Sequence, residues 1–132
     1  IIKYPHSMIA SDGLPHDHHP HPRLWGTFPR VLGKYSREEN LISLEDAVYR
    51  MSGKPAEVFG LSRRGEVAVG NFADIVVFNP DTVIDKADFE NPMEPAAGID
   101  AVFVNGQAVY RDGASTGARP GKAFKRQSSA AY

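Results

Sequence analysis

The chain of 132 residues has no cysteine, no long apolar run and almost no excess of charge. Without cysteine there can be no disulfide, no thiolate nucleophile and no cysteine ligand for zinc, which fits a reducing compartment and predicts a cytoplasmic location. Apolar runs such as Ile75 to Phe78 are far shorter than the roughly 20 residues that span a bilayer. We therefore expect no membrane-spanning segment and no membrane partner.

The charge is nearly balanced. Fifteen Lys and Arg stand against sixteen Asp and Glu, giving a net charge of −1. A chain of this charge lacks the basic surface typical of a nucleic-acid binder, so we expect no nucleic-acid partner. With 42% hydrophobic and 23% charged residues, the composition is that of a globular protein with a core.

The first residues indicate a piece of a longer protein. The sequence starts at Ile1 with neither an initiator Met nor a signal peptide. The apolar run Ser7 to Ser11, followed by Asp12 and Gly13, has the pattern of a buried strand, yet the sequence offers it no parallel neighbour. We expect its neighbours in a missing segment ahead of this chain.

Helices are predicted in the first half, after a loop rich in proline and histidine. Thr27 predicts the start of one helix, and Ser43 predicts that of a second. Gly53 and Pro55 are expected to end the second helix, and residues 56–59 form a third helical piece.

Strand patterns fill the second half. Two hairpins are predicted, over the turns Gly70-Asn71 and Asn105-Gly106, with strands at Glu66–Val69, Ala73–Phe78, Ala101–Val104 and Gln107–Tyr110. The tail from Ser115 to Tyr132 is rich in Gly, Ser, Ala and basic residues. We expect this tail to be extended or disordered except where a partner holds it.

One cluster has the residue types of a metal site. Four imidazoles and a carboxylate occupy six positions: His16, Asp17, His18, His19 and His21. These groups suit Zn, Ni or Cu, but their spacing matches no standard site. The alternative is a loop held by hydrogen bonds from histidine to the backbone.

Asp12 and Arg23 are the other candidates, and each has two interpretations. Asp12 ends an apolar strand, where a carboxylate can be a general base or a metal ligand, or can simply form a turn with Gly13. Arg23 presents a planar fork that can hold a carboxylate in two parallel hydrogen bonds, or can stack on Trp25 at the surface.

Two motifs resemble known enzymes. The run from Ser11 to Gly33, SDGLPHDHHPHPRLWGTFPRVLG, resembles the D-aminoacylases, or N-acyl-D-amino-acid deacylases, of the amidohydrolase superfamily. Leu44 to Leu61 is similar to their last barrel helix. Gly65 to Phe78 and Val102 to Gly106 are similar to the signature and final hairpin that close many amidohydrolases.

The resemblance implies an α/β fold, the end of a (β/α)8 metal-dependent hydrolase barrel followed by part of a small β-sandwich. Ser7 to Ser11 would be barrel strand eight. Asp12 would be the catalytic aspartate, which takes a proton from the metal-bound water and passes it to the leaving amine. Arg23 would hold the substrate's α-carboxylate, with Ser11 and Gly13 beside it.

The resemblance also implies a zinc cofactor whose ligands lie mostly in the missing N-terminal barrel portion. Asp12 would approach the metal only through its bound water, and the histidine loop would be wall and scaffold. Residues 1–62 would complete the barrel, 63–114 the sandwich and 115–132 a flexible tail. We expect hydrolysis of N-acyl-D-amino acids by the whole enzyme and none by this chain alone. The alternatives are a non-catalytic metal-binding module built on His16 to His21, or a β-rich interaction domain.

Overall fold

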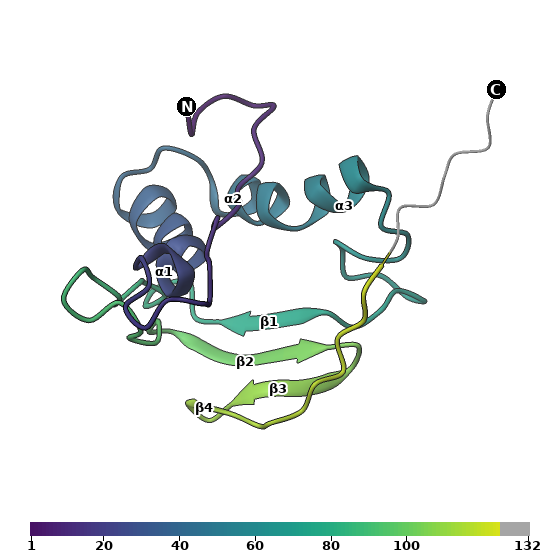
Figure 1. Ribbon diagram of the computed structural model, residues 1–132. Helices are drawn as coiled ribbons and strands as arrows, with labels where there is room; N and C mark the ends of the chain where they lie inside the picture. The colour runs from purple at the N-terminus through teal and green to yellow at the C-terminus, as the bar shows by residue number, and fades with distance from the viewer. Residues whose placement is uncertain (125–132) are drawn as a thin grey trace.

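The computed structural model describes residues 1–124 and places a layer of helices over an antiparallel sheet (Figure 1). The helices are α1 (Arg23–Arg30), the π-helix η1 (Val31–Glu38) that continues it, α2 (Leu44–Met51) and α3 (Gly53–Phe59). The strands are β1 (Ile75–Phe78), β2 (Ile99–Val104), β3 (Gln107–Arg111) and β4 (Ala114–Ser115), hydrogen-bonded in that order. No described helix is long and apolar enough to cross a membrane.

The first helix starts earlier than predicted. α1 begins at Arg23, after Pro22 with φ −52° and ψ −25°, so the proline already has helical backbone angles. Thr27 lies one turn inside the helix, and its Oγ1 donates to the carbonyl of Arg23 at 2.9 Å. The predicted start at Thr27 is therefore wrong, because its hydroxyl bonds back along a helix that has already begun.

The second helix starts as predicted, and its end differs in one respect. Ser43 Oγ accepts a hydrogen bond from the Asp46 amide at 3.1 Å and caps α2. α2 ends at Met51, but Pro55 does not act as a stop. It lies in the first turn of α3, where the missing N–H has no partner to lose, and Gly60 with φ +68° ends that helix.

One of the two predicted hairpins forms. Asn105 and Gly106 have φ +48° and +80°, as a two-residue turn requires, and join β2 to β3. The predicted strand Glu66–Val69 is wrong: the segment is turn and loop, and Val67 and Val69 are exposed. Alternating residues without a neighbouring strand cannot form a ladder, and β1 pairs instead with β2.

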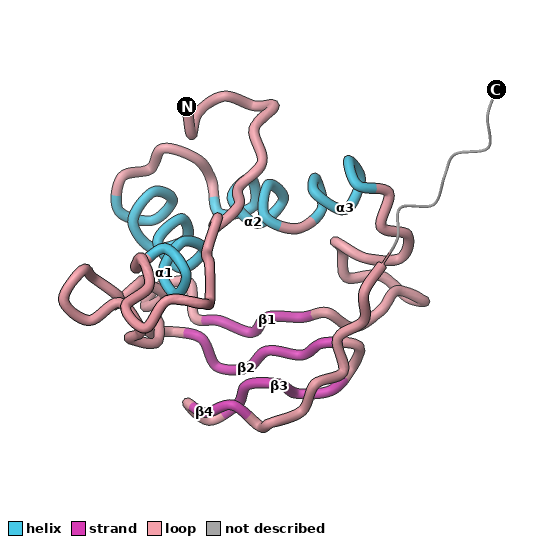
Figure 2. Tube along the Cα trace, in the orientation of Figure 1, coloured by secondary structure: helices cyan, strands magenta, loops and turns pink. Residues whose placement is uncertain are grey.

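A further hairpin was not predicted. Asp112 and Gly113, with φ +53° and +78°, turn β3 into the short β4. Asp-Gly is a hairpin signal like Asn-Gly, but the two residues of β4 are too few to make a strand pattern. Figure 2 shows the four strands as one sheet, with long loops between β1 and the helices and between β1 and β2.

The core lies between the helices, the C-terminal end of β1 and the N-terminal end of β2. Its buried residues are Val31, Leu32, Ile42, Ala47 and Val83, with Phe78 and Ile99 packed against them. Gly33 allows η1 to pack closely against the backbone of Val83, because a Cβ at position 33 would lie 2.3 Å from the Val83 carbonyl oxygen. Arg37 Nη1 donates to the same oxygen at 2.7 Å.

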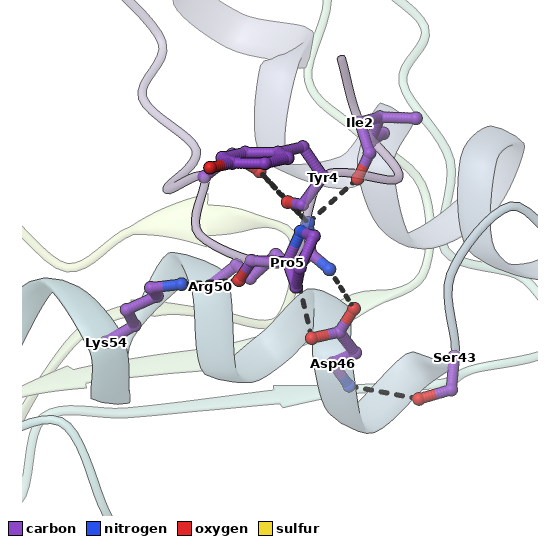
Figure 3. A network of polar contacts seen from close by, with 8 residues as sticks. Ile2, Tyr4, Pro5, Ser43, Asp46, Arg50 and Lys54 are labelled. Atoms are coloured by element: carbon purple, nitrogen blue, oxygen red, sulfur yellow. Dashed lines mark hydrogen bonds and ion pairs between the residues drawn. The ribbon is translucent and has the colours of Figure 1, made fainter.

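The segment Ser7–Ser11 is not assigned as a strand in this structure, and the neighbouring strands predicted for it are not among the described residues. Its residues alternate between half-buried and exposed, and no strand of the described residues pairs with it. Its Ile9 amide donates to the carbonyl of Arg50 at 3.2 Å. The Arg50 side chain, only 4% exposed, reaches back from α2 and fixes the N-terminal segment through its polar atoms (Figure 3).

Replacing Arg50 by Met is expected to destabilise the fold by about 3 kcal/mol, the range for breaking a buried charged network. Arg50 Nη1 donates to the carbonyls of Ile2 and Tyr4 at 2.8 and 2.7 Å, and Nη2 pairs with Asp46 at 2.6 Å. The measurement is urea unfolding. Lys54→Met is the control, because Lys54 bonds the carbonyl of Pro5 at an exposed site and is expected to cost under about 0.5 kcal/mol. Equal effects of the two changes would contradict the role given to Arg50.

Asp74 ties the turn between β2 and β3, as expected for a carboxylate with a structural role. Its Oδ1 accepts from the Asn105 amide at 2.8 Å, and its Oδ2 pairs with Arg64. Arg64 Nη2 also donates to Asn105 Oδ1 at 2.6 Å. Burial raises the pKa of Asp74, but the bonds from Asn105 and Arg64 and the guanidinium charge outweigh it, so the pKa lies below its ordinary 3.8.

A lowered carboxyl pKa stabilises the fold above the ordinary pKa and loses that effect as the pH falls through the folded-state value. We expect the free energy of unfolding to fall as the pH drops below about 4, and Asp74→Asn to remove part of that fall. The measurement is urea unfolding of both proteins over a pH series. Parallel pH curves for wild type and variant would show that Asp74 contributes nothing to the acid sensitivity.

The tail is held for part of its length. Asn105 Nδ2 donates to the carbonyl of Pro120 at 2.7 Å, and the Arg64 guanidinium lies 4.4 Å from the centre of the Phe124 ring. The predicted tail therefore contacts the rest of the chain as far as Phe124. Residues 125–132 lie outside the described part of the chain.

Candidate active site

Asp12 and Arg23, singled out separately in the sequence, form an ion pair. Asp12 ends the extended N-terminal segment, and Arg23 is the first residue of α1. Arg23 Nη2 lies 2.9 Å from Asp12 Oδ2, with side chains 41% and 78% exposed. The pair thus places a potential proton acceptor within hydrogen-bond distance of a cationic fork, on an open surface. No cation–π contact of the described residues involves Trp25, so Arg23 is paired and not stacked.

The turn around Asp12 packs directly on α1. Asp12 has φ +48°, and the Gly13 amide donates to Ser11 Oγ at 3.3 Å. A Cβ on Gly13 would lie 2.9 Å from the Cα of Leu24, so only glycine allows this approach. The sequence-predicted residues Ser11, Asp12, Gly13 and Arg23 are therefore brought together by one contact between turn and helix.

The histidine loop contacts a segment that is distant in the sequence, and its side chains do not converge on a common centre. His19 Nε2 lies 2.9 Å from the carbonyl oxygen of Phe89, and the His21 ring stands edge-on to the Phe89 ring, 5.1 Å between centres. His16 and His18 are exposed. Within residues 1–124, no three His, Asp or Glu side chains lie together in a way that could hold a metal ion. The contacts of His19 and His21 are those of a scaffold.

Asp85 is a residue near the site that sequence reasoning missed. Its Oδ2 lies 2.7 Å from Arg30 Nη1 at the far end of α1, and this bond raises the pKa of Arg30. Asp85 also packs under Gly26, whose missing Cβ would lie 3.1 Å from the Asp85 Cβ. The loop between β1 and β2 thus contacts α1 through Asp85 and the loop that precedes α1 through Phe89. No motif marks these residues, which lie more than 50 positions from their partners.

Two hollows of the described surface lie away from this pair. The larger, of about 470 Å³, runs between α2, α3 and β1 and is lined by residues that include Val48, Tyr49 and Phe78. The other lies along α3 and the loop that follows it. With side chains 78% and 41% exposed, Asp12 and Arg23 stand at an open surface.

An arginine that holds one carboxylate at an exposed helix start has the chemistry to hold the carboxylate of another molecule. The model of the amidohydrolase family matches residues 2–110. The chain belongs to the amidohydrolase family.

The chain is similar to several enzymes of that family. It is 55% identical over 126 residues to a D-aminoacylase and 52% identical over 131 residues to an N-acyl-D-glutamate deacylase, both from Alcaligenes xylosoxydans xylosoxydans. These matches cover 96% and 99% of the chain but 26% and 27% of the relatives. The chain therefore spans about a quarter of their length.

Two solved structures have the same fold over most of the chain. A D-aminoacylase structure superposes with a TM-score of 0.88 at 58% identity, covering 89% of this chain and 25% of that one. An N-acyl-D-glutamate deacylase from Bordetella bronchiseptica, complexed with zinc and a phosphonate inhibitor, gives a TM-score of 0.82 at 50% identity. It covers 86% of this chain and 24% of that one.

Proposed function

We propose that these residues form the C-terminal quarter of a zinc-dependent amidohydrolase that hydrolyses N-acyl-D-amino acids to a D-amino acid and a carboxylate. The relatives named for this activity match nearly the whole chain at 55% and 52% identity. The observation that carries the proposal is the ion pair of Asp12 and Arg23 at 2.9 Å, a proton acceptor beside a carboxylate-binding group.

Arg23 binds the substrate's α-carboxylate in this proposal. The guanidinium already holds one carboxylate, that of Asp12, through a contact of 2.9 Å between Nη2 and Oδ2, and its planar fork can hold a substrate carboxylate in two parallel hydrogen bonds. When the substrate arrives, its carboxylate replaces Asp12 on Arg23. The backbone of Asp12 is fixed by the turn with Gly13. Its side chain, 78% exposed, then reorients toward the reacting groups.

Asp12 moves the proton. Water adds to the acyl carbon, and the Asp12 carboxylate accepts the proton that this water loses. The bond between the acyl carbon and nitrogen then breaks, and Asp12 returns the proton to the leaving amine. The products are the carboxylate and the free D-amino acid, whose own carboxylate leaves Arg23 for Asp12 to occupy again. Ser11 and the Gly13 amide line the approach to the substrate.

The described residues do not make a metal site of their own. No three ligating side chains meet among residues 1–124, and the Asp12 carboxylate is engaged with Arg23. We therefore place the ligands of the zinc, which the related deacylase structure contains, mostly in the N-terminal barrel portion of the enzyme. The same reasoning predicts that the 132 residues alone do not turn over substrate.

The remaining architecture follows from the same proposal. Segment 7–11 is the last strand of a barrel in this proposal. The strands that would flank it are not among the described residues. The sheet β1–β4 is part of a small β-sandwich, residues 1–62 belong to the barrel and 63–114 to the sandwich. Support comes from the likeness to a D-aminoacylase over 89% of this chain.

The test is a substrate panel with the full-length, zinc-loaded enzyme. N-acetyl-D-leucine, N-acetyl-D-glutamate and N-acetyl-D-aspartate are each offered beside their L-enantiomers, and release of the free amine is measured. We expect at least one D-enantiomer to be hydrolysed, and its L-enantiomer to be hydrolysed much more slowly or not at all. Equal rates on both enantiomers, or no hydrolysis of any D-substrate, would contradict the proposal.

A further inference from the structure

The first amide of α1 has an unusual partner. The N-cap residue is Pro22, which has no side-chain acceptor, so a capping bond must come from elsewhere. His21 supplies it: the Arg23 amide donates to His21 Nδ1 at 3.1 Å. The next amide, of Leu24, donates to the His21 backbone carbonyl at 3.0 Å. His21 thus holds the start of the helix by both its ring and its backbone.

The His21 ring is itself held in place. Its neighbours Pro20 and Pro22 are both buried, and proline restricts the backbone of the residue before it. The ring stands edge-to-face on Phe89, with 5.1 Å between centres and 75° between planes. The Phe89 carbonyl is in turn bonded to His19 Nε2 at 2.9 Å. A loop from the second half of the chain therefore fixes the imidazole whose Nδ1 accepts from Arg23.

We infer that His21 is a positioning residue for the carboxylate-binding Arg23, an inference that rests on the proposed function. His21 does not touch the substrate. It fixes the backbone of the residue that carries the guanidinium, while Asp85 fixes the other end of the same helix through Arg30 at 2.7 Å. Small displacements of a binding group cost large factors in rate, so an unfixed helix start would weaken carboxylate binding.

Two substitutions separate the capping role from mere occupancy of the position. In His21→Asn the amide oxygen takes the place of Nδ1 and can still accept from the Arg23 amide. In His21→Gln the amide group takes the place of Nε2, so the acceptor next to Arg23 is lost. Both changes remove the aromatic contact with Phe89, so an effect on folding alone would move both variants alike.

The experiment measures kcat and KM of the full-length, zinc-loaded enzyme on N-acetyl-D-leucine and on N-acetyl-D-leucinamide, which has no carboxylate. His21→Gln is expected to raise KM for the acid about fivefold to tenfold with kcat within about twofold, the range for one lost cap. KM for the amide is expected to stay unchanged, and His21→Asn to raise KM for the acid only about threefold, because it keeps the acceptor for the Arg23 amide and loses only the contact with Phe89. Phe89→Leu, which frees the imidazole without altering residue 21, is expected to raise KM for the acid about threefold.

Three results overturn the inference. If both His21 variants raise KM for the acid equally, or if His21→Gln affects acid and amide alike, His21 has no specific role toward Arg23 and the proposed function stands. If wild-type enzyme hydrolyses neither substrate, nor any other D-substrate of the panel above, the proposed function and this inference fall together.

Discussion

Replacing Asp12 by Asn in the full-length enzyme is expected to lower kcat for N-acetyl-D-leucine about 10³-fold, within the range for losing a general acid–base group. The amide has nearly the same shape as the carboxylate but cannot accept the proton from water. KM is expected to stay the same or to fall, because the neutral side chain no longer competes with the substrate's carboxylate for Arg23. The measurement is steady-state kinetics of amine release.

Asp17→Asn is the matched control for Asp12. Asp17 is an exposed carboxylate in the same loop, and its replacement is expected to leave kcat within about twofold. Thermal unfolding of both variants separates loss of chemistry from loss of fold. An Asp12→Asn enzyme that kept more than a tenth of the wild-type kcat would remove Asp12 from the proposed mechanism.

The second large effect is expected from Arg23→Lys. Lysine keeps the charge but loses the planar fork that makes two parallel hydrogen bonds to a carboxylate. We expect KM for N-acetyl-D-leucine to rise roughly 30-fold to 100-fold, about 2 to 3 kcal/mol, with a smaller change in kcat. With N-acetyl-D-leucinamide as substrate, wild type and variant are expected to have similar KM, because the group that Arg23 binds is absent.

Arg111→Lys is the control for Arg23, since Arg111 lies on β3 with its side chain exposed. It is expected to leave both kinetic constants unchanged within about twofold. An equal rise of KM for the acid and the amide in Arg23→Lys would show that Arg23 supports the fold of the site and does not bind the carboxylate.

Local signals in the sequence predicted local structure where the partner was also local. The turn at Asn105-Gly106 and the cap at Ser43 need only residues within a few positions, and both are confirmed. The pattern of Glu66–Val69 needed a neighbouring strand, found none, and became loop. Thr27 carried a capping signal, but Pro22 and His21 start the helix one turn earlier.

The site could be predicted only in part. Asp12 and Arg23 were each ambiguous by position alone, and the resemblance of the run Ser11 to Gly33 to the D-aminoacylases brought them into one site. Their ion pair forms because Gly13 lets the turn pack on the start of α1. Asp85 and Phe89 could not be found in the same way, because they act through contacts across 55 and 70 positions that no sequence pattern records.

The exposure of the pair explains what the rest of the enzyme must add. With Asp12 78% exposed and Arg23 41% exposed, the site lacks walls around the pair and a shield from water. The chain spans about a quarter of its relatives, and we expect the remaining three quarters to supply both. Closing the site would strengthen the bond between Arg23 and a bound carboxylate, because screening by water falls.

A crystal structure of the full-length Asp12→Asn enzyme with N-acetyl-D-leucine bound tests the central claim most directly, since the slowed reaction preserves the substrate. We expect both oxygens of the substrate's carboxylate to lie within hydrogen-bond distance of the Arg23 guanidinium. The intact scissile amide bond is expected to lie next to the side chain at position 12. A substrate bound with its carboxylate away from Arg23, or with its amide out of reach of position 12, would contradict the proposed site.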